Sequence, residues 1–349
     1  MIMVNPHSKL NSRLFDADVE QKPIRAGFGE GLLKAAEADK RIVGLCADLT
    51  ESTQMHLFKA KFPERFVEIG VAEQNLATVA SGMAAMGKIP FISSYAVFSP
   101  GRNWEQIRTT ICYNNQPVKI AGSHAGVSVG PDGGSHQALE DIAITRALPR
   151  MVVISPCDAI EAKKATIAAS KTDSPTYIRL AREKTPIITT EETPFEIGKA
   201  QVVFKSEILN SKQARNPKSE IRKHAADVGI IATGALLFKA LKVAKRLEEE
   251  GKNVTVMNLA TIKPLDTDAI IKLAHDAGAI VTVEEHQIAG GMGSAVAECL
   301  AAHFPVPIEF IGVHDKFGQS GTPEELIELY GMGEKSIYEA AQKAMMRKS

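Results

Sequence analysis

Several residues able to do chemistry follow short apolar runs of the sequence. Asp48 follows the run 42–47, His124 follows the run 118–121, and Glu73 begins a helical pattern just after the run 66–69. The full set combines carboxylates, aromatic rings, imidazoles and a guanidinium: Asp48, Glu73, Tyr95, Phe98, His124, His136 and Arg182. Groups of these types that converge on one place are typical of a catalytic or binding site.

Each of these residues also has a purely structural interpretation. Glu73 in a first helical turn would complement the helix dipole, and Asp48 would cap a helix. The aromatic residues would be ordinary core side chains, and the histidines would be buried with satisfied hydrogen bonds. The interpretation as a site therefore depends on the whole set lying together rather than on any one member.

Apolar runs alternate with helical patterns along the chain. The strand candidates are 42–47, 66–69, 91–95, 118–121, 151–155, 176–180, 228–233, 254–259, 280–283 and 308–311. The helix candidates are 28–36, 71–86, 104–113, 139–147, 159–170, 236–250, 268–277 and 294–303. This alternation predicts an α/β fold with two doubly wound parallel-sheet domains. Ligands bind beyond the carboxyl ends of strands in such sheets, which is where the chemical residues fall.

The alternation is interrupted after residue 182, which divides the chain. We expect an N-terminal tail at 1–21, a first domain at 22–190, a linker with a charged loop at 191–226 and a second domain at 227–349. The stretch 205–226 carries six Lys or Arg without interleaved aromatic residues. A solvated loop is therefore favoured over a nucleic-acid surface.

The overall charge favours neither nucleic acid nor a membrane as a partner. Lys plus Arg and Asp plus Glu number 41 each in the 349 residues. The four cysteines lie far apart, which predicts free thiols in a reducing compartment. Neither a signal peptide nor an apolar run of membrane-spanning length is evident, so we expect a cytoplasmic protein.

Several segments together resemble the transketolase family. FVEIGVAEQNLATVASGMA resembles the segment with the family's catalytic glutamate, which implies that role for Glu73. CADLTEST resembles the Ala-Asp-Leu-Thr-x-Ser segment of transketolases and matches Asp48 and Ser52. IRAGFGE and RLARE match the segments of the family's phosphate-binding arginines, here Arg25 and Arg182.

One further segment strengthens the resemblance. GSHAGVSVGPDGGSHQALEDI resembles the family's His-x(n)-Asp-Gly-x-Thr-His-Gln stretch. It matches His124, Asp132 and His136, with Ser135 in place of the usual threonine. The resemblance runs from about residue 22 to the C-terminus.

The resemblance implies a thiamine-diphosphate site. The Glu73 carboxyl group would hydrogen-bond the pyrimidine ring, Phe98 would stack on it, and Tyr95 would line the pocket. Asp48 is assigned to the cofactor as well, as is Arg102, which follows the family position occupied by Gly101. His124 and His136 join Glu73 as catalytic residues. The residues implied for sugar-phosphate binding are Arg25, Ser52, His124, Asp132, His136 and Arg182.

The sequence departs from a complete enzyme of this family in one respect. It has no Gly-Asp-Gly, the motif of the domain that holds the diphosphate and the metal. The resemblance therefore implies the C-terminal subunit of a split transketolase, with a pyrimidine-binding and a C-terminal domain and no metal ligands of its own. An N-terminal subunit would supply Gly-Asp-Gly and the Mg²⁺ ligands, in an α₂β₂ assembly. The implied reaction is transfer of a two-carbon ketol unit from a ketose phosphate to an aldose phosphate.

Three alternatives remain open. Half of a deoxyxylulose-phosphate synthase would share the chemistry, although those synthases carry Asp where His124 stands. The β subunit of a 2-oxo-acid dehydrogenase would leave the arginines and the Asp132–His136 pair without a purpose. A scaffolding or regulatory subunit would not need the matched polar residues at all.

Overall fold

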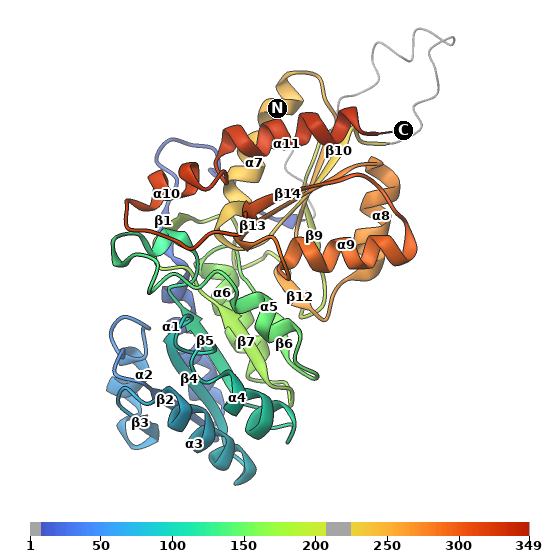
Figure 1. Ribbon diagram of the computed structural model, residues 1–349. Helices are drawn as coiled ribbons and strands as arrows, with labels where there is room; N and C mark the ends of the chain where they lie inside the picture. The colour runs from blue at the N-terminus through green and yellow to red at the C-terminus, as the bar shows by residue number, and fades with distance from the viewer. Residues whose placement is uncertain (1–7, 207–224, 349) are drawn as a thin grey trace, which may run out of the picture.

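The computed structural model describes residues 8–206 and 225–348, which form two α/β domains, one above the other in Figure 1. The first domain contains a seven-stranded sheet in the order β12-β6-β7-β5-β4-β2-β3. Six of these strands are parallel and belong to the first half of the chain: β2 (Ile42–Cys46), β3 (Phe66–Glu68), β4 (Ile89–Tyr95), β5 (Lys119–Ser123), β6 (Val152–Ile154) and β7 (Thr176–Arg179). The predicted parallel sheet is thus confirmed for this domain.

Helices cover both faces of the first sheet because neighbouring residues of each strand point to opposite sides. Phe91, Ala121 and Ile178 pack with α1 (Ile24–Ala38), α2 (His56–Lys61) and α6 (Ala159–Ala169). Their sequence neighbours Ile92, Ile120 and Tyr177 pack on the opposite face. The helices there are α3 (Glu73–Ala85), α4 (Trp104–Gln106), which continues as a π-helical segment Ile107–Cys112, and α5 (Asp141–Arg146).

Helices α1 and α6 approach each other so closely that glycine is required between them. A Cβ atom on Gly27 would lie 1.8 Å from the carbonyl oxygen of Ala159, and one on Gly31 would lie 2.7 Å from that of Lys163. These glycines therefore serve helix packing.

The second domain has a five-stranded sheet in the order β14-β13-β10-β11-β9. Its parallel strands are β10 (Val228–Ala232), β11 (Val254–Asn258), β13 (Ile280–Gln287) and β14 (Ile308–Val313). On one face lie α8 (Thr267–Ala277) and α9 (Met292–His303), and on the other α7 (Leu237–Glu249) and α11 (Glu334–Met346). The short helix α10 (Pro323–Leu329) precedes α11.

Each sheet also has one antiparallel edge strand that the sequence patterns did not predict. Strand β9 (Gln201–Lys205) pairs with β11 and lies within the range predicted as linker. Strand β12 (Thr261–Lys263) belongs to the second half of the chain yet pairs with β6 of the first domain. The fold is therefore α/β with two mainly parallel sheets, and the two domains share a strand pairing.

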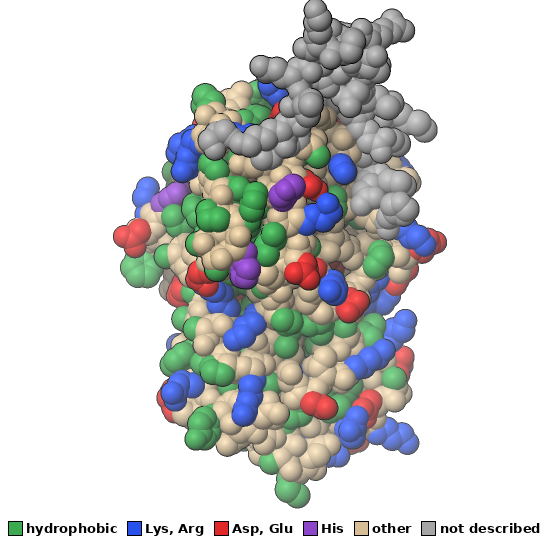
Figure 2. All heavy atoms as spheres, turned by 90° about the vertical axis from the view of Figure 1, so that its right-hand side faces the viewer, with side chains coloured by type: hydrophobic (Ala, Val, Ile, Leu, Met, Phe, Trp, Pro, Cys, Tyr) green, Lys and Arg blue, Asp and Glu red, His purple; other side chains and the backbone are tan. Residues whose placement is uncertain are grey.

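Strands β1 (Gln21–Pro23) and β8 (Lys184–Pro186) join the two ends of the first domain as an antiparallel pair. The predicted tail is described from Ser8 onwards, and residues 207–224 of the predicted charged loop lie outside the described residues. Within the described ranges, no helix is both long and apolar enough to cross a bilayer. On the face shown in Figure 2, acidic and basic side chains are interspersed.

Candidate active site

Two adjacent strands of the first sheet place Tyr95 and His124 face to face. Tyr95 ends β4 and is paired in register with Ser123, the last residue of β5. His124 follows directly with φ 56°, which turns its ring back over the sheet edge. The ring centroids of Tyr95 and His124 are 3.8 Å apart and their planes differ by 21°. The stack follows from the parallel register of the two strands.

Two further rings complete an aromatic cluster. Phe98 lies in the turn after β4, and His136 lies in the loop between β5 and α5. The His136 ring meets Phe98 edge-on, with centroids 5.4 Å apart and an interplanar angle of 79°. It also meets Tyr95 edge-on at 6.1 Å. The structure therefore brings together Tyr95, Phe98, His124 and His136, as the parallel-sheet argument predicts.

His124 is held as a neutral imidazole. It is 2% exposed, and its Nδ1 lies 2.9 Å from the hydroxyl of Ser123. Burial, followed by the positive charges of Arg25 and Arg182 and by His136, lowers the pKa of His124 to about 3. A neutral imidazole in this place can accept or donate a hydrogen bond without adding charge.

The ring signals of His124 are therefore expected not to titrate in NMR spectra recorded between pH 5 and 8. In the unfolded chain the same ring protonates near its ordinary value of about 6.5. Because the folded state resists protonation down to about pH 3, this group lowers stability as the pH falls through that window. A folded-state titration near neutrality would contradict the buried arrangement.

Arg25 and Arg182 lie close enough for their charges to repel. Burial and then the charge of Arg182 lower the pKa of Arg25. Nη1 of Arg25 donates to the carbonyl oxygen of Ser52 at 2.5 Å, while its buried Nε has no hydrogen-bond partner among the described residues. Nη1 of Arg182 donates to the carbonyl oxygen of Val129 at 3.0 Å and to Glu183 at 2.8 Å. Two neighbouring guanidinium groups with a buried donor left over suit an anion.

Glu73 is a buried carboxylate with few partners. It is the first residue of α3 and is 3% exposed. Among the described residues, its carboxylate accepts one hydrogen bond, from Nη1 of Arg102 at 3.3 Å. Its backbone carbonyl accepts from the Asn103 side chain at 2.9 Å, and Asn103 also donates to Ser99 at 3.2 Å. The segment that carries Arg102 thereby fixes the start of α3.

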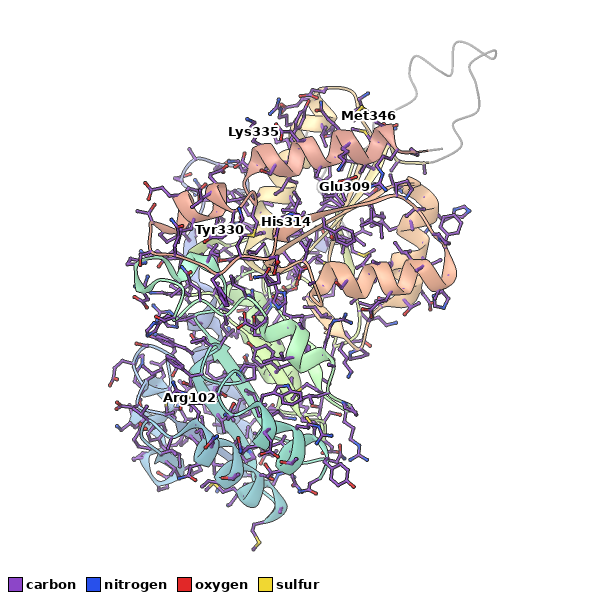
Figure 3. All side chains as sticks on the ribbon, in the orientation of Figure 1. Arg102, Glu309, His314, Tyr330, Lys335 and Met346 are labelled. Carbon is purple, nitrogen blue, oxygen red and sulfur yellow. The ribbon has the colours of Figure 1, made fainter. Side chains whose placement is uncertain are left out.

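Arg102 connects Glu73 with the aromatic cluster. Its guanidinium carbon lies 5.0 Å from the centroid of the Phe98 ring. Its side chain is 53% exposed, against 3% for Glu73, and Figure 3 places it on the first domain. Because it is exposed, this arginine can move away from Glu73 and leave the buried carboxylate free to bind another group.

The strand-end loop with Asp48 is held by a residue that the sequence patterns did not single out. Asp48 is exposed and has φ 59°. The Glu68 carboxylate accepts from the amides of Asp48 at 2.8 Å and Gly70 at 3.0 Å and from the Thr50 hydroxyl at 3.0 Å. The only available sequence signal was the position of Glu68 at the end of its strand.

Asp48 and Asp132 stand apart from the rings. Asp132 is exposed at the end of the turn Val127–Asp132. No hydrogen bond, ion pair or ring contact within 8–206 and 225–348 joins either carboxylate to the aromatic cluster. The described residues also contain no group of three or more His, Cys, Asp or Glu side chains suited to a metal ion.

Comparison with known proteins decides the family. The profile of the transketolase pyrimidine-binding domain matches residues 20–187, and that of the transketolase C-terminal domain matches residues 217–337. The chain belongs to the transketolase family. It corresponds to the C-terminal subunit of a split transketolase, with the pyrimidine-binding and C-terminal domains. Domains of this family imply the use of thiamine diphosphate.

Relatives of similar length support this division. A putative transketolase C-terminal section from Methanocaldococcus jannaschii is 41% identical over 93% of this chain and 97% of its own length. The 6-deoxy-6-sulfo-D-fructose transketolase subunit SqwH of Clostridium sp. is 36% identical over 96% of this chain and 98% of its own. A solved structure described as a split gene transketolase, inactive β4 tetramer, is 41% identical with a TM-score of 0.82, and the match covers 94% of this chain and 99% of that one.

The residues present fit the pyrimidine half of thiamine diphosphate. A flat ring of this kind needs an aromatic face and a carboxyl group at its edge. Phe98 would offer the face, and Glu73 would offer a carboxylate, which is buried and accepts a single hydrogen bond, 3.3 Å long, among the described residues. A buried carboxylate with so few partners retains the capacity to bind a ring nitrogen.

Proposed function

We propose that this subunit, together with an N-terminal subunit, transfers a two-carbon ketol unit from a ketose phosphate to an aldose phosphate. The observation that carries the proposal is the pair Arg25 and Arg182 next to the neutral His124. A phosphate dianion would relieve the repulsion between the two guanidinium groups. His124, which feels the charge of both arginines, also stacks on Tyr95 of the aromatic cluster, so the phosphate tail would lie beside the arginines and the cofactor ring beside the aromatic side chains.

Five residues of this chain are assigned to the cofactor. When bound, thiamine diphosphate supplies the carbon that holds the ketol unit during transfer. Glu73 would hydrogen-bond the pyrimidine nitrogen and share a proton with it, once Arg102 moves from the carboxylate to contact the cofactor itself. Phe98 would stack on the ring, Tyr95 would border the pocket, and Asp48 would contact the cofactor from the loop that Glu68 holds.

A second group of residues would bind the sugar phosphate. We assign His124 and His136 to hydroxyl groups near the reacting carbons and to proton transfer there, because both rings border Tyr95. Asp132 would bind a further hydroxyl group of the ketose. Arg25, Ser52 and Arg182 would bind the phosphate, with Ser52 next to Arg25 through its carbonyl oxygen.

The site needs a second polypeptide in this proposal. The partner subunit would carry Gly-Asp-Gly and hold the diphosphate and Mg²⁺, and the assembly would be α₂β₂. Apolar side chains are exposed along α3 and at its two ends: Val71 just before the helix is 70% exposed, Val79 within it 39% and Met86 just after it 84%. Such surface suits a contact with another chain. The solved relative described as a β4 tetramer is described as inactive, which supports the need for a partner.

We also propose a cellular compartment and domain boundaries for this chain. The four cysteines are buried and free, which suits a reducing cytoplasm. We place the domain boundaries at 22–190 and 227–349, with the intervening residues as a linker that includes β9. The family profiles end and begin at 187 and 217, within or near that linker.

The decisive experiment mixes this chain with its partner subunit, thiamine diphosphate and Mg²⁺. We expect ketol transfer from xylulose 5-phosphate to ribose 5-phosphate, and none from this chain alone. Relatives named for apulose 4-phosphate and 6-deoxy-6-sulfofructose make these two ketoses the natural alternative donors. Product from pyruvate and glyceraldehyde 3-phosphate, without ketol transfer from any of these ketoses, would instead identify a deoxyxylulose-phosphate synthase.

A further inference from the structure

The loop that carries the proposed sugar-binding residues has little regular structure of its own. This sugar loop, residues 124–137, contains His124, Asp132 and His136. Four of its residues have left-handed backbone, with φ 56° at His124, 91° at Gly126, 80° at Gly130 and 75° at Gly133. Among the described residues, its first residues are joined to neighbouring extended backbone by the isolated bridge of Ala125 with Ala138 and by the bond from the Ala125 amide to the Leu180 carbonyl oxygen at 3.2 Å. The loop therefore depends on contacts from elsewhere for its conformation.

One such contact comes from the second domain. The backbone amide of Ser128 donates to Oε1 of Glu285 at 2.6 Å, across the domain boundary. Glu285 lies in β13 and is 3% exposed. The two segments of the polypeptide approach closely here: a Cβ atom on Gly126 would lie 2.2 Å from the same carboxylate oxygen. A charged acceptor thus holds the middle of the sugar loop.

Glu285 is itself held in place by the first domain. Nη2 of Arg179 donates to the Glu285 carbonyl oxygen at 2.7 Å, and Nε of Arg179 donates to Asp141 at 2.8 Å. The Tyr177 hydroxyl donates to the same Asp141 oxygen at 2.7 Å. Burial raises the pKa of Glu285, and the charge of Arg179 opposes that rise. The carboxylate therefore sits in a buried, hydrogen-bonded frame that spans both domains.

The end of the sugar loop has a second contact with the same domain. The Gln137 side chain donates to the carbonyl oxygen of Val127 within the loop and to that of Gln319 in the second domain, each at 3.0 Å. A Cβ atom on Gly134 would lie 2.6 Å from the carbonyl oxygen of Gly318. The segment with Gln319 runs between His314 and Tyr330, which Figure 3 labels. Backbone from the two domains is thus in direct contact on this side as well.

From these contacts we infer that Glu285 is a positioning residue for the reaction: the second domain acts on the first by holding the sugar loop through the Glu285 carboxylate and the Gln137 amide. The inference rests on the proposed function of His124, Asp132 and His136. It gives the second domain a role in substrate binding without any of its side chains reaching the substrate.

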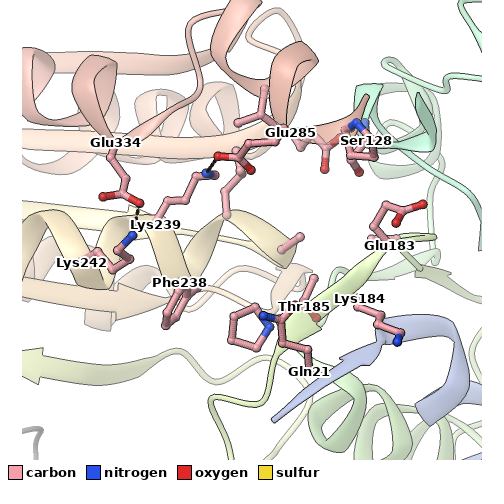
Figure 4. A pocket seen from close by; sticks show the side chains of 17 residues that line it. Gln21, Ser128, Glu183, Lys184, Thr185, Phe238, Lys239, Lys242, Glu285 and Glu334 are labelled. Carbon is pink, nitrogen blue, oxygen red and sulfur yellow. Dashed lines mark hydrogen bonds and ion pairs between the residues drawn. The ribbon is translucent and has the colours of Figure 1, made fainter. Parts of the chain in front are cut away.

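Glu285 borders a cavity next to its contact with Ser128, so the negative charge of Glu285 can be removed by substitution without a change in packing. The cavity has a volume of about 310 Å³ and is lined by Ser128 and Glu285 on one side and by Gln21 and Thr185 on the other (Figure 4). Glu285→Gln removes the charge but keeps the shape, and its new NH₂ group can be hydrated from this space. The amide oxygen can still accept from Ser128, although more weakly.

In the assembled enzyme, Glu285→Gln is expected to lower kcat/KM for the ketose phosphate about tenfold, which corresponds to about 1.4 kcal/mol. The loss should appear chiefly in KM, because the sugar loop carries the substrate residues. The affinity for thiamine diphosphate should stay unchanged, since Glu73 and Phe98 lie outside the loop. Glu284→Gln is the matched control: Glu284 is the adjacent buried carboxylate of β13, and it accepts from the amides of Met292 and Gly293 within its own domain.

Hydrogen exchange provides a readout that does not need activity. In the chain by itself, backbone amides of peptides covering 124–137 should exchange about tenfold faster in Glu285→Gln than in the wild type or Glu284→Gln. Gln137→Met, which keeps the length of the side chain and removes its amide, should give the same selective loss from the other end. If Glu285→Gln fails to fold, the exchange experiment can be carried out with Gln137→Met instead.

The outcomes separate the two proposals. Unchanged exchange of 124–137 in both folded variants, or an unchanged KM for the ketose in an active assembly, would overturn the positioning role. Absence of ketol transfer in the wild-type assembly would refute the proposed function, and the exchange experiment would still decide whether Glu285 holds the loop.

Discussion

Glu73→Gln is expected to lower ketol transfer by the assembled enzyme by about 10²–10⁴-fold, the usual contribution of a positioned acid or base. Glutamine fills the same space at the start of α3 but cannot share a proton with the pyrimidine ring. The backbone contact with Asn103 should persist, because it uses the Glu73 carbonyl oxygen. Steady-state rates measured at saturating cofactor test this result.

Glu64→Gln provides the control for Glu73→Gln. Its side chain is 68% exposed and lies in a turn of the same domain, so the same chemical change should leave the rate unaltered. Circular dichroism and assembly with the partner subunit should be equal in both variants. If Glu73→Gln retained full activity, a scaffolding role for this chain would be the better interpretation.

Arg25→Gln is expected to raise the KM for a ketose phosphate by about 100-fold. Truncation of one partner of a charge pair costs about 2–5 kcal/mol, and each 1.4 kcal/mol is tenfold. Glutamine keeps much of the side-chain length on α1 but loses the charge that faces Arg182. An unphosphorylated ketose has no phosphate group for Arg25 to bind, so its KM should be nearly the same in the variant and the wild type.

Arg41→Gln gives the matched control for the second prediction. Arg41 lies just before β2, at the opposite end of the sheet, where its 65% exposed side chain pairs with Asp39. It should leave both KM values unchanged. Equal losses for phosphorylated and unphosphorylated sugars in Arg25→Gln would show that the arginine supports the fold rather than the phosphate.

The sequence predicts the parallel part of the fold well because strands buried on both faces have a strong apolar signal. Every strand candidate corresponds to an observed strand, with ends displaced by a few residues. Strand β12 was not predicted because it has a single apolar residue, Ile262, between Thr261 and Lys263, and because its partner, β6, belongs to the other domain. Helix α10, which is not among the helix candidates, had a usable signal: Thr322 and Glu325 form a capping box, with Pro323 in the first helical turn.

The positions of candidate site residues could be predicted from the sequence where they depend on strand order, but not where they depend on contacts between loops. Tyr95 and His124 meet because β4 and β5 are adjacent and parallel. Glu68 and Glu285 could not be identified in this way, because their main partners are backbone amides, those of Asp48 and Gly70 for Glu68 and that of Ser128 for Glu285. Backbone amides are present in every residue, so no pattern of side chains indicates which of them will meet a carboxylate.

The pairing of β12 with β6 bears on attempts to divide the molecule. A fragment that stopped at the linker would leave β6 as an open sheet edge, since its neighbour is Thr261–Lys263. Open edges recruit strands from other molecules and promote aggregation. The gap between the two family profiles, from residue 187 to residue 217, is therefore an unsuitable place to divide the polypeptide, and a fragment containing the first domain should retain Thr261–Lys263.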